Sequence, residues 1–151
     1  MIDRCELADR LHKEGYNCAQ AVFGAFCDLT GYDMKEAAAL SGGMGGGMGG
    51  SYVDVCGAIS GGCMVLSLLF PFTDPSQQPV KLHLYELGKE FHSRFNKVFD
   101  STRCGELRAA KPGISDATPA AARLGLSRHC DIMIVTAVEL LEQLLRENGK
   151  L

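Results

Sequence analysis

The sequence predicts an all-α fold in a single domain. Apolar residues recur at steps of three and four along most of the chain, and no stretch shows the alternation of a half-buried strand. A chain of 151 residues with 46% hydrophobic and 22% charged residues suits one globular domain with a sizeable core. We therefore predict that residues 1–151 form a compact bundle of about six helices, with a glycine-rich loop before a central apolar helix.

Capping signals predict three helices in the first part of the chain. Asp3 with Glu6, and Asn17 with Gln20, have the spacing of a capping box, so each pair is predicted to begin a helix. Glycines are expected to end these helices near positions 15 and 31, because glycine favours the conformation that follows a helix. Asp33 is predicted to cap a short third helix through residue 40.

A glycine run and an uncharged segment occupy the middle of the chain. Residues 42–50 are glycine except for Met44 and Met48, and a helix loses about 1 kcal/mol for each interior glycine, so a loop is predicted. Asp54 is expected to begin a central apolar helix that ends before Pro71. A membrane span is the competing interpretation, but glycines dilute the segment and no basic anchors flank it, so we predict no span.

The last part of the chain is predicted to hold three more helices. Asp74-Pro75 is expected to open a long helix, whose core-facing stripe consists of Val80, Leu84, Leu87, Phe91, Phe95 and Val98. A short helix should begin at Cys104. A loop is predicted next from its turn residues Pro112, Gly113, Ser115, Asp116 and Pro119. The final helix is expected to run from Ser127 to about residue 148.

Four of the seven cysteines closely follow residues that commonly cap helices. These are Cys18, Cys56, Cys104 and Cys130, which follow Asn17, Asp54, Thr102 and Ser127. A helix N-terminus carries positive partial charge, so this position is expected to lower the pKa of each thiol and to favour the thiolate. No Cys-x-x-Cys pair occurs, so local spacing gives no support for a metal, and any shared site must be assembled by the tertiary fold.

Several fragments occur in an order shared with a known family. They are Gly15-Tyr-Asn-Cys-Ala-Gln-Ala-Val, Gly45-Gly-Gly-Met-Gly, Cys56-Gly-Ala-Ile-Ser-Gly61, Cys104-Gly-Glu-Leu and Cys130. From about Leu7 to Leu145 the chain resembles the redox-active family named C-GCAxxG-C-C for its cysteine pattern. The resemblance places the four cysteines of that pattern on the four cysteines above and implies redox activity without fixing a substrate.

The same resemblance favours an iron–sulfur cofactor. A similar segment forms part of split-Soret cytochromes, where an iron–sulfur cluster accompanies the haems. The haem-attachment motif Cys-x-x-Cys-His is absent from this chain, so covalent haem is not expected. We predict an iron–sulfur cluster or a related metal centre for electron transfer or redox sensing, held by Cys18, Cys56, Cys104 and Cys130.

Glycines are predicted to let the backbone approach this cofactor closely. The cofactor-binding glycines are expected in the loop and on one face of the central helix, at Gly45, Gly46, Gly47, Gly57 and Gly61. No catalytic residue is assigned. Cys5 is expected on an exposed first turn, and roles are left open for Cys5, Cys27, Cys63 and His129. Two alternatives remain: a dithiol–disulfide protein that uses two of the same cysteines, and a helical interaction module with buried cysteines.

Other partners and cofactors are not expected. A net charge of −3 without a Lys/Arg run argues against nucleic acid. Gly45, Gly47 and Gly50 match G-x-G-x-x-G by glycine repetition alone, with no preceding strand, so no nucleotide is predicted. The start lacks an apolar signal-peptide region, and a cytoplasmic protein is expected. The partner is predicted to be an unidentified redox partner, and a homodimer is left open.

Overall fold

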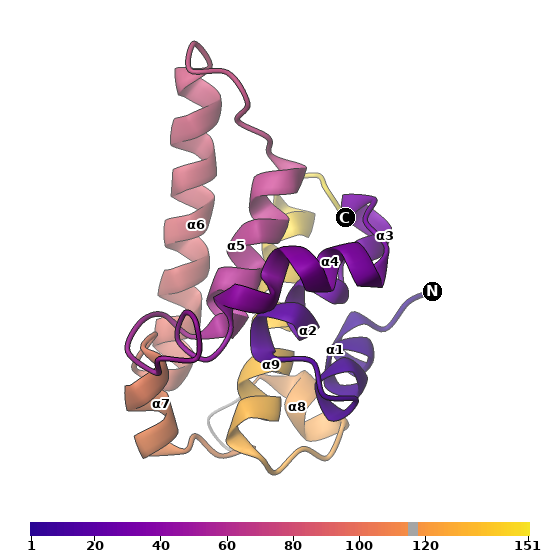
Figure 1. Cartoon of the computed structure of the whole chain (residues 1–151), viewed down its shortest axis with the longest axis vertical. Helices are drawn as coiled ribbons and strands as arrows, with labels where there is room; N and C mark the ends of the chain where they lie inside the picture. Colours follow the sequence, from indigo (N-terminus) through magenta and orange to yellow (C-terminus); the bar gives the residue numbers. More distant parts are fainter. Residues whose placement is uncertain (115–117) are drawn as a thin grey trace.

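A computed structural model of the chain describes residues 1–114 and 118–151, and the predicted all-α class is confirmed (Figure 1). Within these residues the helices are α1 Arg4–Lys13, α2 Cys18–Gly24, α3 Cys27–Thr30, α4 Met34–Ser41, the 3-10 turn η1 Gly42–Met44, α5 Gly57–Leu69, α6 Gln78–Phe99, α7 Cys104–Ala110, α8 Pro119–Arg123 and α9 His129–Glu147. The predicted turn residues Ser115 and Asp116 lie outside the described residues.

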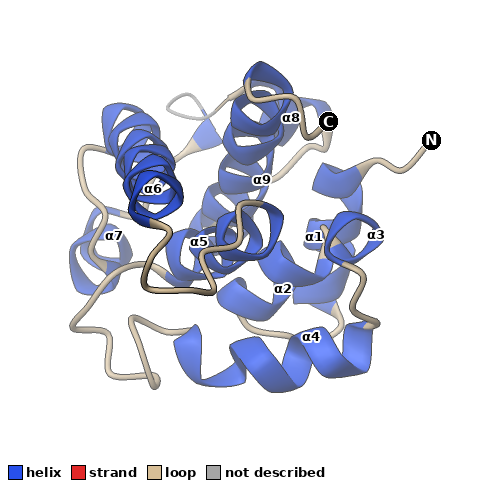
Figure 2. Ribbon diagram, turned by 90° about the horizontal axis from the view of Figure 1, so that it is seen from above, coloured by secondary structure: helices blue, strands red, loops and turns tan. Residues whose placement is uncertain are grey.

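The helices surround a central pair formed by α5 and α9 (Figure 2). Helix α6 packs against both members of this pair on one side, while α2 packs against both on the other. Helices α1 and α4 in turn pack against α2. Among the described residues, no helix combines the length and the apolar character needed to cross a membrane.

Glycines on α5 allow its neighbours to approach closely. A Cβ atom added to Gly61 would lie 2.5 Å from the carbonyl oxygen of Ala19 on α2. A Cβ atom added to Gly62 would overlap the ring of Phe91 on α6. Real Cβ atoms essentially never lie within 3.0 Å of such neighbours. The two glycines therefore set the spacing of α2 and α6 on opposite sides of α5.

Two predicted segments differ in the structure. The single helix expected up to position 31 is divided into α2 and α3, because Phe26 leaves the helical conformation with φ −110° and ψ 15°. Part of the loop predicted around residues 112–119 instead forms the start of α8, whose first position holds Pro119. Proline is suited to that position because it lacks the amide hydrogen that would have no partner there.

Several predicted helix caps are also wrong, although α7 begins at Cys104 as predicted. Asp54, Thr102 and Ser127 are not caps: α5, α7 and α9 begin after Cys56, Arg103 and Arg128, none of which makes a side-chain capping hydrogen bond. The physical reason is clear for Asp54 and Thr102, since their carbonyl oxygens accept long-range backbone hydrogen bonds at an isolated β-bridge. Likewise, α6 begins after Gln77, and Asp74-Pro75 forms the turn that precedes it.

Candidate functional site

Four helix starts meet at one small cavity. Cys18 and Cys104 are the first residues of α2 and α7, Cys56 precedes the first residue of α5, and Cys130 is the second residue of α9. All four line a cavity of about 60 Å³, which we call the cysteine cavity. The fold thus brings together residues that lie up to 112 positions apart in the sequence.

The remaining walls of the cysteine cavity are largely apolar. They consist of Gly46, Tyr52, Leu107, Arg108, Met133 and Ile134. The guanidinium carbon of Arg108 lies 3.9 Å from the centroid of the Tyr52 ring, which is a cation–π contact between α7 and the end of the glycine-rich loop. Neither Tyr52 nor Arg108 was selected from the sequence, since only the tertiary fold places them beside the cysteines.

Backbone hydrogen bonds fix two of the cysteines relative to each other. The amide of Cys56 donates to the carbonyl oxygen of Thr102 at 2.8 Å, and the amide of Cys104 donates to that of Asp54 at 2.9 Å. These two bonds join the start of α5 to the start of α7. They satisfy donors that a helix terminus would otherwise leave without partners.

Asn17 joins a third helix start to the glycine-rich loop. Its side chain accepts from the amide of Gln20, and the side chain of Gln20 accepts from the amide of Asn17, which completes the predicted capping box of α2. The Asn17 side-chain amide also donates to the carbonyl oxygen of Gly42 at 2.9 Å. One residue therefore positions both Cys18 and the beginning of the loop.

The predicted glycines differ in how they contact this site. A Cβ atom on Gly57 would overlap the Cys18 sulfur, and one on Gly47 would lie 2.7 Å from Cys104 Cβ. Gly46, at φ +59°, is the one that lines the cysteine cavity. Gly45 instead abuts the side chain of Asn17, and Gly61 abuts the backbone of α2.

Burial has the largest effect on the pKa values of the cavity thiols. It raises the pKa of Cys56, Cys104 and Cys130, and proximity to Cys18 raises each of these pKa values further. The expectation that helix termini lower these pKa values is therefore wrong for the three residues, because the loss of solvation outweighs the helix dipole. Arg108 acts in the opposite direction and lowers the pKa of both Cys104 and Cys130.

The described residues contain no ready-made site for a single metal ion. Across the described residues, no three side chains of Cys, His, Asp or Glu lie close enough together to hold one metal ion. A single zinc ion would need four sulfurs at about 2.3 Å from one point. An iron–sulfur cluster with four cysteine ligands binds its thiolates at several irons, so it needs four cysteines around a volume rather than around one point.

The three other cysteines lie elsewhere. Cys5 was expected on an exposed turn but is buried between α1 and α9, and burial raises its pKa to about 12. Cys27 is the first residue of α3 and does not line the cysteine cavity. Cys63 lines a separate groove. His129 precedes Cys130, and burial, followed by nearby Arg108, lowers the pKa of its imidazole.

Comparison with known proteins agrees with the pattern of cysteines. The family model described as "Putative redox-active protein (C_GCAxxG_C_C)" matches residues 16–144, a span that includes all four cysteines of the cavity. No curated protein and no solved structure matches the chain.

Proposed function

Because the chain belongs to the C_GCAxxG_C_C family of redox-active proteins, we propose that its cysteine cavity holds an iron–sulfur cluster for electron transfer or redox sensing. The ligands would be Cys18, Cys56, Cys104 and Cys130. The observation that carries the proposal is that these four thiols, each at a helix start, line one cavity.

The size of the cavity supports an inorganic group. Its volume of about 60 Å³ is far below the roughly 300–1,000 Å³ of pockets that hold organic ligands. A flavin or a haem would not fit without displacing a helix. A cluster assembled from iron and sulfide requires much less space, and its chemistry, when bound, is reversible electron transfer.

The charges around the cavity also suit a thiolate-ligated cluster. Because burial favours the neutral thiol, ionised cysteines here require a bound cation, and iron provides that positive charge. The four helix N-termini and Arg108 would stabilise the net negative charge of a cluster with four thiolate ligands. Leu107, Met133 and Ile134 would shield it from water.

A dithiol–disulfide function is the second candidate, and the position of Cys18 favours it. Cys18 lies close enough to Cys56, Cys104 and Cys130 to raise the pKa of each. A disulfide from Cys18 to one of them would release two electrons and two protons to an oxidised partner disulfide, which would become a dithiol. The raised pKa values oppose rapid thiolate attack, so we rank this function below the cluster.

Anaerobic purification separates the two candidates. For the cluster we expect coloured protein that contains iron and acid-labile sulfide, and replacement of any of the four cavity cysteines by serine should lower both contents. Cys27→Ser is the matched control, since Cys27 also begins a helix but lies outside the cavity lining. Its iron content should equal that of the wild type.

Two results would reject the cluster. One is a colourless, iron-free protein after anaerobic reconstitution with iron and sulfide. The other is an equal loss of iron from Cys27→Ser and Cys56→Ser. If the colourless protein lost two free thiols on mild oxidation, and Cys18→Ser lost none, the dithiol–disulfide function would replace it.

A further inference from the structure

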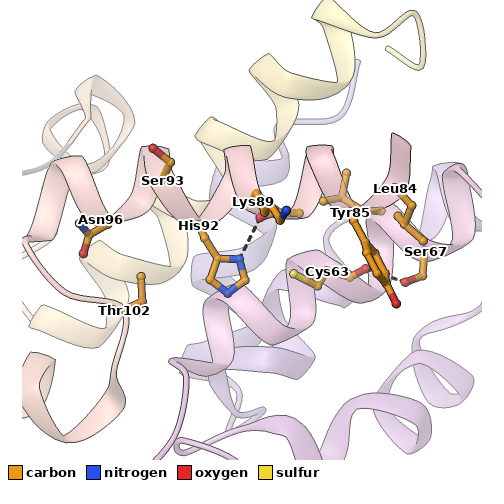
Figure 3. A pocket seen from close by; sticks show the side chains of 11 residues that line it. Cys63, Ser67, Leu84, Tyr85, Lys89, His92, Ser93, Asn96 and Thr102 are labelled. Atoms are coloured by element: carbon orange, nitrogen blue, oxygen red, sulfur yellow. Dashed lines mark hydrogen bonds between the residues drawn. The ribbon is translucent and has the colours of Figure 1, made fainter. Parts of the chain in front are cut away.

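A second, larger hollow lies between α5 and α6. This α5–α6 groove has a volume of about 740 Å³, and one end is bounded by Thr102 (Figure 3). Helix α5 contributes Cys63, Leu66 and Ser67, and all the other lining residues except Thr102 belong to α6. The volume falls within the range typical of sites for small organic molecules.

Two aromatic side chains on α6 project into the groove. Tyr85 and His92 are seven positions apart, so they lie on the same face of the helix and about 10 Å apart along its axis. Figure 3 shows both rings extending from α6 toward α5, with Cys63 between them on the opposite wall. Leu66 and Leu84 add apolar surface. A flat ring lying in the groove along the junction of the two helices would meet aromatic and aliphatic groups.

The imidazole of His92 is held in one tautomer. Its Nδ1 lies 2.9 Å from the carbonyl oxygen of Gly88, and because a carbonyl only accepts, Nδ1 must carry the proton. In the neutral ring, Nε2 is then a hydrogen-bond acceptor. Within the part of the chain that the structure describes, Nε2 has no hydrogen-bond partner, and it points into the groove (Figure 3).

The charged and thiol groups of the groove limit what it can bind and how. No carboxylate lines the groove, whereas Lys89 does, so a cationic ligand is disfavoured. Burial raises the pKa of Cys63 to about 11, which keeps this thiol protonated and a poor nucleophile at neutral pH. The groove therefore suits reversible binding. The Nε2 atom of His92 has a fixed orientation and lies among aromatic and aliphatic groups, while Ser93, Asn96 and Thr102 add polar groups toward one end.

From these features we propose that the α5–α6 groove binds a flat aromatic molecule that carries a hydroxyl group, as a hydroquinone does. The hydroxyl donates to Nε2 of His92, and the ring lies beside Tyr85 over Cys63. Helix α5 connects Cys63 with Cys56, seven residues away, so this ligand lies about 10 Å from the cysteine cavity along the helix. The binding does not depend on what the cysteine cavity holds.

Two fluorescent probes of nearly equal shape test the proposal. 2-Naphthol has a hydroxyl donor, and 2-methoxynaphthalene has the same rings without one. The chain has no tryptophan, so titrations can follow naphthalene fluorescence with little background from the protein. We expect 2-naphthol to bind about 2- to 10-fold more tightly, which corresponds to one hydrogen bond. His92→Phe should abolish this preference, while the control His83→Phe on the same helix should retain it.

A blocking variant addresses whether the probes occupy the groove. A Cβ atom on Gly88 would meet nothing within 4 Å, so Gly88→Leu should fold and fill the groove. Both probes should then bind at least 10-fold more weakly. Equal affinity of the wild type for both probes, or unchanged binding by Gly88→Leu, would overturn the proposal. A third result would also overturn it: the wild type binds neither probe and sediments as a dimer, and Gly88→Leu sediments as a monomer. A second copy of the chain would then occupy the groove.

Discussion

A single added methyl group at Gly57 tests how tightly the helix starts converge. Local propensity alone predicts that Gly57→Ala stabilises α5, by up to about 1 kcal/mol. The structure predicts the opposite. The new Cβ atom would overlap the Cys18 sulfur and would lie 3.1 Å from both the amide nitrogen of Ala19 and the Cα atom of Gly45.

The size of the effect follows from what surrounds the methyl group. Overpacking a closely packed site costs about 1–3 kcal/mol, and the upper end applies here because two of the three neighbours are backbone atoms. After subtraction of the propensity gain, we expect a net loss of about 2 kcal/mol. For a chain of this size the melting temperature should fall by about 4–8 °C. Cys18 should also shift, which would lower the iron content of anaerobically prepared protein.

Thermal melting followed by circular dichroism and iron analysis on the same samples would measure both effects. Gly88→Ala is the matched control, because Gly88 is also helical but a Cβ atom there meets open space. That variant should melt about 2–4 °C higher with unchanged iron. The reasoning would be refuted if Gly57→Ala behaved like Gly88→Ala, with a higher melting temperature and full iron content.

Three further changes should alter stability in measurable ways. Asn17→Ala removes both the cap of α2 and the bond to Gly42, so urea unfolding should show a loss of about 1–2 kcal/mol. Arg4→Ala removes the ion pairs of Arg4 with Asp28 and Glu142, and because Asp28 is exposed while Glu142 is more buried, urea unfolding should show a loss of about 2 kcal/mol. Burial raises the pKa of Cys63 from 9.0 in the unfolded chain to about 11 in the folded protein. The buried neutral thiol therefore makes its full contribution to the free energy of unfolding below pH 9, and this contribution is lost as the pH rises through 11. In reducing buffer, Cys63→Ser should therefore lose about 1 kcal/mol less than the wild type between pH 7 and pH 10.

Periodicity and local capping signals predicted much of the fold. Asp3, Asn17 and Asp33 cap helices as the sequence indicated, because each side chain bonds an amide only three residues away. The start of α5 could not be predicted in this way. It is determined by backbone hydrogen bonds to residues near α7, almost fifty positions later, and such pairing leaves no local signal.

The four cysteines predicted as metal ligands all line the cysteine cavity, although part of the reasoning that selected them was wrong, and metal binding by them stays a prediction. Only Cys18 follows a residue that caps its helix with a side chain, and burial outweighs the expected lowering of pKa for the other three. Cys27 shows that a thiol at a helix start is not by itself a sign of the site. The order of motifs shared with the family was the more specific guide. The Tyr52–Arg108 contact and the α5–α6 groove arise from packing between distant segments, which periodicity does not reveal.

Helix α7 is short, and its stability would determine how long the proposed cluster survives in air. This helix has seven residues, too few to be stable alone, and of these only Leu107 is buried. Its attachments near the cavity are the two backbone bonds to the start of α5 and the contact of Arg108 with Tyr52. Brief detachment of α7 would carry Cys104 away and expose together the three other cysteines that we propose as ligands. We therefore expect the rate of oxidative loss to follow the opening of α7, and hydrogen exchange of its amides to slow most when the centre is loaded.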